Sequence, residues 1–223
     1  MAHVRVIAGL RDVDGCQGAQ KPLITDPHHN FAAMNARIGA NTKSVFVCNP
    51  NIPTAVLDHQ TTVRNFVSMT VLVTADHNII VSRAASKIHS LVGLRIGFAV
   101  ARPDVIKQMA QFATGNRCTF GVRAALASVQ DTGYQTFVKA SNCEGRAMRT
   151  TALTKAGRRI APSQTNFVFL HPGRPVEQLR NHFLTNGFRA GRAFHSYGDW
   201  CQVSIGAPDE MKQFVQLIPG ALT

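Results

Sequence analysis

The residues with the clearest chemical potential lie between residues 82 and 98, in the run SRAASKIHSLVGLRIGF. A Ser86-Lys87 pair sits there in a small-residue turn, and Arg95 follows eight residues after the lysine. A guanidinium and a short hydroxyl group are suitable donors for a phosphate dianion. A lysine shielded from water is available as a free amine, which can attack a carbonyl carbon. A single lysine after a strand is usually a solvated surface residue, so the prediction depends on the whole run.

The elements around this run predict an α/β fold. Four unbroken apolar runs indicate strands buried on both faces of a mostly parallel sheet, at residues 44–49, 71–73, 79–82 and 96–101. Helices are expected from Pro103 and over residues 134–156, 175–186 and 208–218, with strands at 166–170 and 203–205. This second half is typical of a smaller α+β domain.

The run at residues 82–98 resembles the lysine signature of the class I/II pyridoxal-phosphate-dependent aminotransferases. In that family a Ser-Lys pair precedes Gly-Leu-Arg-x-Gly at this spacing. The resemblance implies pyridoxal 5'-phosphate as cofactor, with Lys87 as its Schiff-base lysine and proton shuttle. It also implies that Arg95 and Ser86 hold the cofactor phosphate. The motif wording and the Arg-Ala-Phe segment are most similar to the histidinol-phosphate aminotransferases.

The same resemblance implies a fold type I arrangement, mostly a parallel sheet with helices on both faces. We expect a partial cofactor-binding large domain at residues 1–115. A small C-terminal α+β domain, with the long connecting helix, is expected at residues 116–223. The family's glycine-rich phosphate turn and its ring-stacking aromatic residue have no counterpart in the sequence, so the large domain is expected to be incomplete.

A second matching segment, VFVCNPNIPTA at residues 45–55, resembles the family's Asn-Pro-x-Asn-Pro-Thr-Gly strand end. The asparagine before Pro-Thr-Gly bonds the phenolic oxygen of the cofactor in the family. Here Ile52 occupies that position, and Ala55 replaces the glycine. Asn51 lies one residue away and is the candidate substitute. In the alternative interpretation, the segment serves only as a turn.

The second half contains the candidate substrate residues. PSQTNFVF at residues 162–169 resembles the small-domain strand and contains Asn166, and residues 186–206 resemble the strand pair whose arginine binds the substrate carboxylate. Gln202 occupies that arginine position, so Arg189 and Arg192 are the candidate replacements. The family's aspartate partner of the pyridine nitrogen is also absent, and Asp76 is the nearest carboxylate.

Composition restricts the alternatives. The formal net charge of +12 favours anionic partners, but the basic residues are dispersed, and one Trp and two Tyr argue against a dedicated nucleic-acid module. The five cysteines form no C-x-x-C pair, and no metal site is assigned.

His89, near Lys87, is either a cofactor contact or a polar turn residue. No apolar run is long enough for a membrane helix and no secretory signal is recognised, so a cytoplasmic protein is expected.

Three functions remain open. The first is a transaminase that moves an amino group from a small-molecule donor to a 2-oxo acid such as 2-oxoglutarate, as a homodimer. The second is a catalytically inactive remnant of the same fold that serves as a binding or dimerisation partner of a relative. The third, carried by charge alone, is a polyanion-binding module.

Overall fold

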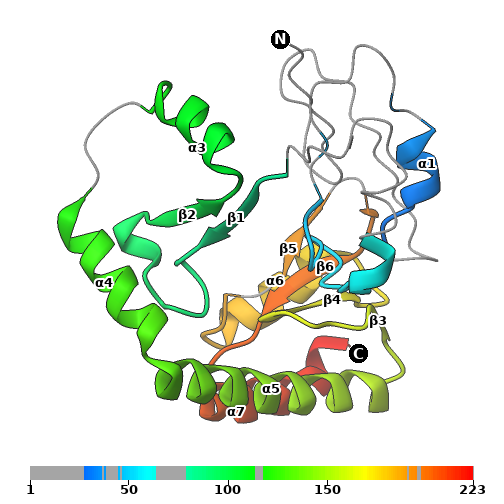
Figure 1. The fold of residues 1–223 in the computed structure, drawn as a ribbon. Coiled ribbons are helices and arrows are strands. Elements are labelled where there is room, and N and C mark those ends of the chain that lie inside the picture. The colour runs from blue at the N-terminus through cyan, green and yellow to red at the C-terminus, as the bar shows by residue number, and fades with distance from the viewer. Residues whose placement is uncertain are drawn as a thin grey trace. The chain divides into compact units, whose positions relative to one another are not determined.

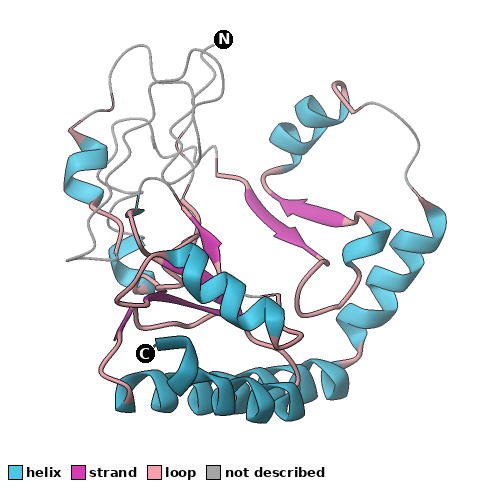
Figure 2. Ribbon diagram, turned by 180° about the vertical axis from the view of Figure 1, so that it is seen from behind, coloured by secondary structure: helices cyan, strands magenta, loops and turns pink. Residues whose placement is uncertain are grey.

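The computed structural model describes residues 28–36, 38, 45, 47–63, 79–113, 118–189, 191–194 and 197–222. The expected strand at residues 71–73 and the candidate Asp76 lie outside these residues, and so does part of the expected strand at 44–49. Figure 1 shows the elements labelled and coloured in chain order, and Figure 2 distinguishes helices, strands and loops in the view from behind. The helices are α1 (Phe31–Asn35), η1 (Val92–Leu94), α3 (Pro103–Ala110), α4 (Thr119–Gln130), α5 (Thr132–Lys155), α6 (Val176–Thr185) and α7 (Pro208–Leu222). The strands are β1 (Val81–Ala84), β2 (Gly97–Val100), β3 (Arg159–Ile160), β4 (Phe167–His171), β5 (Arg192–Ala193) and β6 (Cys201–Ser204).

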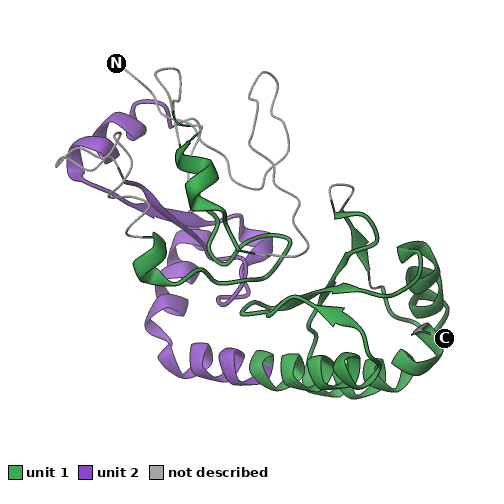
Figure 3. Cartoon of the chain, turned by 90° about the vertical axis from the view of Figure 1, so that its right-hand side faces the viewer, with its two compact units in different colours: residues 1–70, 142–223 green, residues 71–141 purple. Residues whose placement is uncertain are grey.

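The chain divides into two compact units (Figure 3). One unit comprises residues 1–70 and 142–223, and the other comprises residues 71–141. The boundary between residues 141 and 142 falls inside α5. The expected division at residue 115 falls within the second unit, and the assignment of functional domains at 1–115 and 116–223 stays a prediction.

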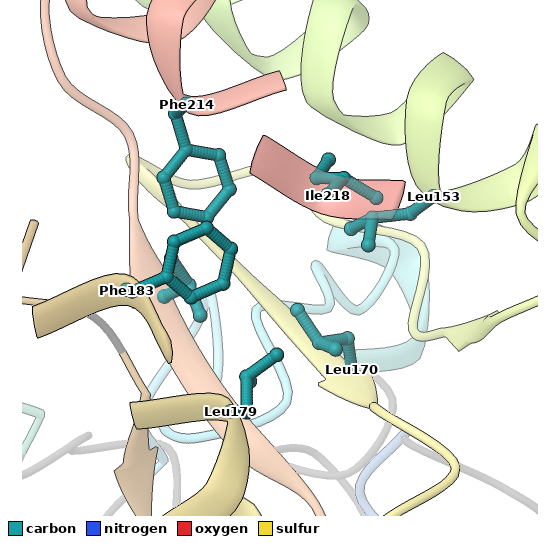
Figure 4. Close-up of a pocket in the computed structure, with 7 residues that line it drawn as sticks. Leu153, Leu170, Leu179, Phe183, Phe214 and Ile218 are labelled. Atoms are coloured by element: carbon teal, nitrogen blue, oxygen red, sulfur yellow. The ribbon is translucent and has the colours of Figure 1, made fainter. Parts of the chain in front are cut away.

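The larger unit contains a four-stranded antiparallel sheet in the order β3-β4-β6-β5. Successive side chains of a strand point to opposite faces, so each face collects alternate residues. One face carries Val168 and Leu170 of β4 with Cys201 and Val203 of β6, and these pack against side chains of α5, α6 and α7. Figure 4 shows the small apolar cavity within this core, where Phe183 and Phe214 stack with centroids 4.2 Å apart.

The opposite face of this sheet carries a second, aromatic core. Phe169 and Trp200 are buried there with Val56 and Ala161, and Phe194 and Tyr197 pack against them. Val56 belongs to the Asn-Pro segment, so that segment is held on this face of the sheet. The sheet thus separates a structural core from a face that contains candidate site residues.

The unit formed by residues 71–141 contains a β1–β2 hairpin and the helices η1, α3 and α4. All β1 side chains are exposed, and the buried residues in the described part of this unit are Ala85, Gly121 and Ala125. The expectation that both strands are buried on both faces is therefore wrong for the described hairpin. All pairings between described strands are antiparallel, so the expected mostly parallel sheet is not found among them. The physical reason is that the loop of residues 85–96 closes on itself, with the Ala85 N–H bonded to the Ile96 carbonyl, so β2 returns beside β1 in the opposite direction.

Most predicted helices are confirmed with shifts of a few residues. Pro103 starts α3 with Asp104 in its first turn, and the chain turns after α5 at Gly157, which has a φ of 68°. The final helix extends past the expected residue 218 through Pro219, and buried Ala221 packs its last turn into the core. Helix α4 was not predicted. No described helix is long and apolar enough to span a bilayer.

Candidate functional site

Lys87 and Arg95 lie on one closed loop between the two strands of the hairpin. Ala84 pairs with Gly97 at the base of this loop, and the Ala85 N–H donates to the Ile96 carbonyl at 3.0 Å. Lys87 follows the end of β1 by three residues, and Arg95 precedes β2 by two. The strand pairing therefore brings the two ends of the predicted motif to the same loop base.

Hydrogen bonds from neighbouring helices hold this loop in place. His89 Nδ1 and Ser128 Oγ of α4 are 2.9 Å apart, and Ser90 Oγ and Tyr134 OH of α5 are 2.8 Å apart. His89 thus has the anchoring role of a polar turn residue. Gly121 of α4 lets the Ile96 side chain pack closely against this helix. A Cβ at residue 121 would collide with the isoleucine side chain.

The amine and guanidinium of the loop are available to a ligand. Lys87 makes no side-chain hydrogen bond or ion pair within the described part of the chain, but it is exposed and so lacks the shielding from water considered from the sequence, while Ser86 is half-buried. Arg95 is exposed, and its only such bond there is from Nη1 to the Val92 carbonyl at 3.0 Å.

No described carboxylate of the unit formed by residues 71–141 competes for these groups. Asp104 pairs with Arg102, whose hydrogen bond lowers the pKa of the carboxyl group. Asp131 accepts from the Tyr134 N–H at 2.8 Å. An uncommitted amine, a guanidinium and a hydroxyl fit a ligand with an aldehyde and a phosphate group. The residues of this loop therefore fit pyridoxal phosphate.

Asn51 lies in the other unit and is buried, with 7% of its surface exposed. Its Nδ2 donates to Thr54 Oγ1 at 3.1 Å, while its Oδ1 is buried without a partner among the described residues. Because an amide can be turned end for end, either its N–H or its C=O can be directed at a ligand. Ile52, at the family's asparagine position, is 43% exposed. Asn51 therefore has a buried amide oxygen without a described partner, while the Ile52 side chain offers no polar atom.

Arg192 and Gln202 lie directly opposite each other on β5 and β6, and Gln202 also lies opposite Phe169 on β4. Directly paired residues project from the same face of an antiparallel sheet, with Cβ atoms about 4.5–5.5 Å apart. The Arg192 guanidinium carbon lies 4.9 Å from the Phe194 ring centroid. Burial raises the pKa of the neighbouring Tyr197 phenol. The guanidinium therefore projects from the aromatic face of the sheet, one strand away from the predicted arginine position.

The remaining candidates have fewer contacts. Arg189 and Asn166 are exposed, and the Asn166 carbonyl accepts from the Ile205 N–H at 2.8 Å. Asn51 and Arg192 belong to the same aromatic face, because the Asn51 N–H donates to the carbonyl of Val56, which packs in the aromatic core. Lys87, Ser86 and Arg95 form one group in the unit of residues 71–141. Asn51, Asn166, Arg189 and Arg192 all belong to the other unit.

Two polar features escaped prediction from sequence. Asp58 is buried and accepts hydrogen bonds from the Nδ1 atoms of both His28 and His29, which lie 29 or more residues away. Arg149 is also buried, at 1% exposure. Its position in α5 offers no local sequence signal of burial. No group of three His, Cys, Asp or Glu residues in the described ranges could hold a metal ion.

Comparisons with known proteins identify the family of this chain. The family "Aminotransferase class I and II" matches residues 56–218. The chain is 29% identical over 226 residues to a histidinol-phosphate aminotransferase of Halalkalibacterium halodurans, in a match that covers 89% of this chain and 61% of the relative. It is 30% identical over 233 residues to an aromatic amino acid aminotransferase of Mycobacteroides abscessus, in a match that covers 92% of this chain and 65% of the relative.

The solved structures show the same fold. The histidinol-phosphate aminotransferase of Sinorhizobium meliloti, solved in complex with pyridoxal-5'-phosphate, superposes with a TM-score of 0.82 at 19% identity. That alignment covers 99% of this chain and 71% of the other. The α/β fold type I expectation is thereby confirmed, while the chain spans 61–65% of the length of the two curated relatives. The family match across most of the chain establishes that this protein belongs to the class I and II aminotransferases.

Proposed function

We propose that this protein is a pyridoxal-phosphate-dependent aminotransferase of the histidinol-phosphate aminotransferase type. The observation that carries the proposal is the closed loop that holds Lys87 and Arg95 between paired strands, with both side chains uncommitted to described carboxylates. Family membership and the similarity to histidinol-phosphate aminotransferases support the same conclusion. The substrates are a small-molecule amino donor and a 2-oxo acid.

The loop residues divide the work at the cofactor. Pyridoxal phosphate, when bound, supplies an aldehyde for the amino group and a ring that takes up electrons. Lys87 Nζ provides the amine that holds the cofactor and the base that moves the substrate's α-proton. Arg95 donates charge-assisted hydrogen bonds to the phosphate, assisted by the Ser86 hydroxyl.

The aromatic face of the sheet provides the substrate contacts. Arg192 projects beside Gln202 and is the guanidinium best placed to bind a carboxylate. Asn51 provides a buried amide with an unused oxygen for a polar group of the cofactor or substrate. Arg189 and Asn166, both exposed, are proposed as outer contacts of the substrate.

A second function rests on a specific observation. Gln202 carries no charge at the arginine position, and the exposed Ile52 cannot donate a hydrogen bond from its side chain. These two residues favour an inactive member of the fold that binds a relative. An incomplete set of substrate and cofactor groups reduces the rate, because orientation supplies much of an enzyme's acceleration.

The visible absorption spectrum with added pyridoxal phosphate distinguishes the two functions. We expect a yellow band and, after borohydride reduction, a mass adduct on the peptide that contains Lys87. Lys87→Ala should lack both, while Lys107→Ala, an exposed lysine on α3, should retain them. A folded wild-type protein without this adduct would exclude the enzyme and leave the inactive binding partner.

We also propose that the enzyme acts in amino-acid biosynthesis in the cytoplasm, as a homodimer. The support is the similarity to histidinol-phosphate aminotransferases. Light scattering of the purified protein tests the dimer: a mass near twice 24.2 kDa is expected, and a mass near 24.2 kDa would contradict it.

A further inference from the structure

A cationic cluster lies at the β3 edge of the four-stranded sheet, at the opposite edge from β5 and its Arg192. Arg159 on β3 lies opposite His171 on β4, and both residues approach Trp200. The Arg159 guanidinium carbon is 5.4 Å from the Trp200 ring centroid, and the His171 centroid is 5.9 Å from it. Arg174 follows directly after the turn that leaves β4. We call Arg159, His171, Arg174 and Trp200 the arginine–tryptophan cluster.

The cluster presents hydrogen-bond donors. The Gly173 N–H donates to His171 Nδ1 at 3.1 Å, so a neutral imidazole carries its proton on Nε2. Trp200 is 4% exposed, and its indole N–H is buried without a partner among the described residues. Arg159 is exposed, with its guanidinium held over the indole ring. A group with several acceptor oxygens would accept from the Arg159 guanidinium and the His171 Nε2–H, directly beside the buried indole.

No described carboxylate forms an ion pair with Arg159 or Arg174. In the unit formed by residues 1–70 and 142–223, Asp58 is engaged by two histidines, Glu177 by Arg180 and Asp209 by Lys212. The Glu210 carboxylate accepts from a backbone N–H. Asp199 and Glu144 make no described ion pair with the cluster. The cluster therefore has positive charge that the described acidic residues do not neutralise.

The Arg158 side chain adds a further positive charge nearby. Its guanidinium lies against Gly173, in the space that a side chain at that residue would need. Two glycine turns with positive φ, at Gly157 and Gly173, bring the neighbouring arginines to the same end of the antiparallel β3–β4 pair. The arrangement follows from the fold and not from a single run of basic residues.

We propose that the arginine–tryptophan cluster is a binding site for a small ligand that bears phosphate groups, at the β3 edge of the sheet and distinct from the Arg192–Gln202 pair at the β5 edge. Guanidinium groups suit phosphate because their N–H donors match its oxygens. A single-stranded nucleic acid is disfavoured, because base stacking needs an exposed ring and Trp200 is buried. The proposal is independent of whether the protein is an active transaminase.

The single tryptophan of the chain makes the proposal directly measurable. Its fluorescence reports on Trp200 alone, and inorganic tripolyphosphate is the probe, with sodium chloride at matched ionic strength as the reference. We expect a saturable change in the emission of the full-length protein. The double variant Arg159→Gln with Arg174→Gln should bind about tenfold more weakly or worse.

A matched control removes the same amount of charge elsewhere. Arg180→Gln with Lys212→Gln replaces two exposed cations that already pair with Glu177 and Asp209. This control should keep wild-type affinity. Equal weakening in both double variants would overturn the proposal, since it would show nonspecific attraction to a protein of net charge +12. An absence of saturation, or saturation by a single-stranded oligonucleotide but not by tripolyphosphate, would overturn it as well.

Discussion

Arg192 and Gln202 face each other across the β5–β6 pair, on the aromatic face of the four-stranded sheet. The motif resemblance matches the uncharged Gln202 to the position where the family carries an arginine. The fold places a guanidinium on the adjacent strand, on the same face. Gln202 has no charge to offer a carboxylate. Arg192 carries that positive charge on the neighbouring strand, on the same face of the unchanged sheet.

This relationship predicts a selective weakening of substrate binding. Arg192→Ala should raise the KM for the 2-oxo acid by about tenfold or more, because a charge-assisted hydrogen-bond pair is removed. The yellow cofactor band should remain, since Arg192 is proposed to contact substrate and not the cofactor. Steady-state kinetics with a spectrum of each variant tests this. An unchanged KM would remove Arg192 from the site.

The converse substitution restores charge at the family position. Gln202→Arg in the Arg192→Ala background should recover substrate binding, because residues 192 and 202 share one face and are direct cross-strand neighbours. Gln202→Arg in the wild-type background places two like charges together and should lower stability slightly. Kinetics of the double variant decides the outcome, and the absence of rescue would contradict a shared substrate position.

Ala55 lies in the left-handed region, with a φ of 67°, and is fully buried. Ala55→Gly should raise the free energy of unfolding by about 1 kcal/mol, because glycine adopts this conformation without a Cβ clash. Ala161→Gly is the control: this alanine is also buried but does not have positive φ, so its substitution should destabilise the protein. Urea denaturation measures the free energy of unfolding of both variants. A lower value for Ala55→Gly than for the wild type would show that the backbone at Ala55 is not strained.

Arg149 is a buried cation without an acidic partner in the described part of the chain. Its Nη1 donates to the Val203 and Ser204 carbonyls at 3.0 and 2.6 Å, and its guanidinium carbon lies 4.1 Å from the Phe214 centroid. Burial lowers the pKa of Arg149 to about 10. Arg149→Met should increase the free energy of unfolding by about 1–2 kcal/mol at pH 7, since it removes an uncompensated charge. Arg149→Ala should instead lower it, because a cavity remains.

The pH dependence of this effect has a definite sign. The folded-state pKa of Arg149 lies below the ordinary value of 12.5, because burial makes the charged guanidinium less favourable in the folded protein. The resulting loss of stability is fully present below about pH 10. The difference in stability between wild type and Arg149→Met should therefore be constant from pH 6 to about 9. It should shrink as the pH rises beyond 10, where the folded protein begins to lose the proton. A stability difference between wild type and Arg149→Met that grows above pH 10 would contradict a buried, charged Arg149.

Cysteine labelling tests the structural core. Cys201 is fully buried, and burial raises the pKa of its thiol to about 12, whereas Cys118 and Cys143 are exposed. At pH 8, iodoacetamide should label Cys118 and Cys143 and spare Cys201 until denaturant is added. Peptide mass mapping gives the order of labelling. Early modification of Cys201 would show that β6 does not lie in the core.

The local sequence determined the starts of α3, α5, α6 and α7 to within a few residues, the strands β4 and β6, and the lysine loop. Pro103 with Asp104 and the spacing of Lys87 and Arg95 carry those signals within a few residues, because capping and turn preferences act over short distances. The family followed from the same short motif. Burial could not be determined in this way, and the apolar character of β1 and β2 led to the incorrect expectation of strands buried on both faces.

Only the tertiary structure decided which distant residues meet. The opposition of Arg192 to Gln202, the two histidines on Asp58 and the Arg159 guanidinium over Trp200 all join segments that are far apart in the sequence or on different strands. Strand register sets these cross-strand neighbours, and a shift by one residue would send every side chain to the other face. The sequence by itself determined the type of chemistry available to this protein, while the sheet register decided which groups can act together.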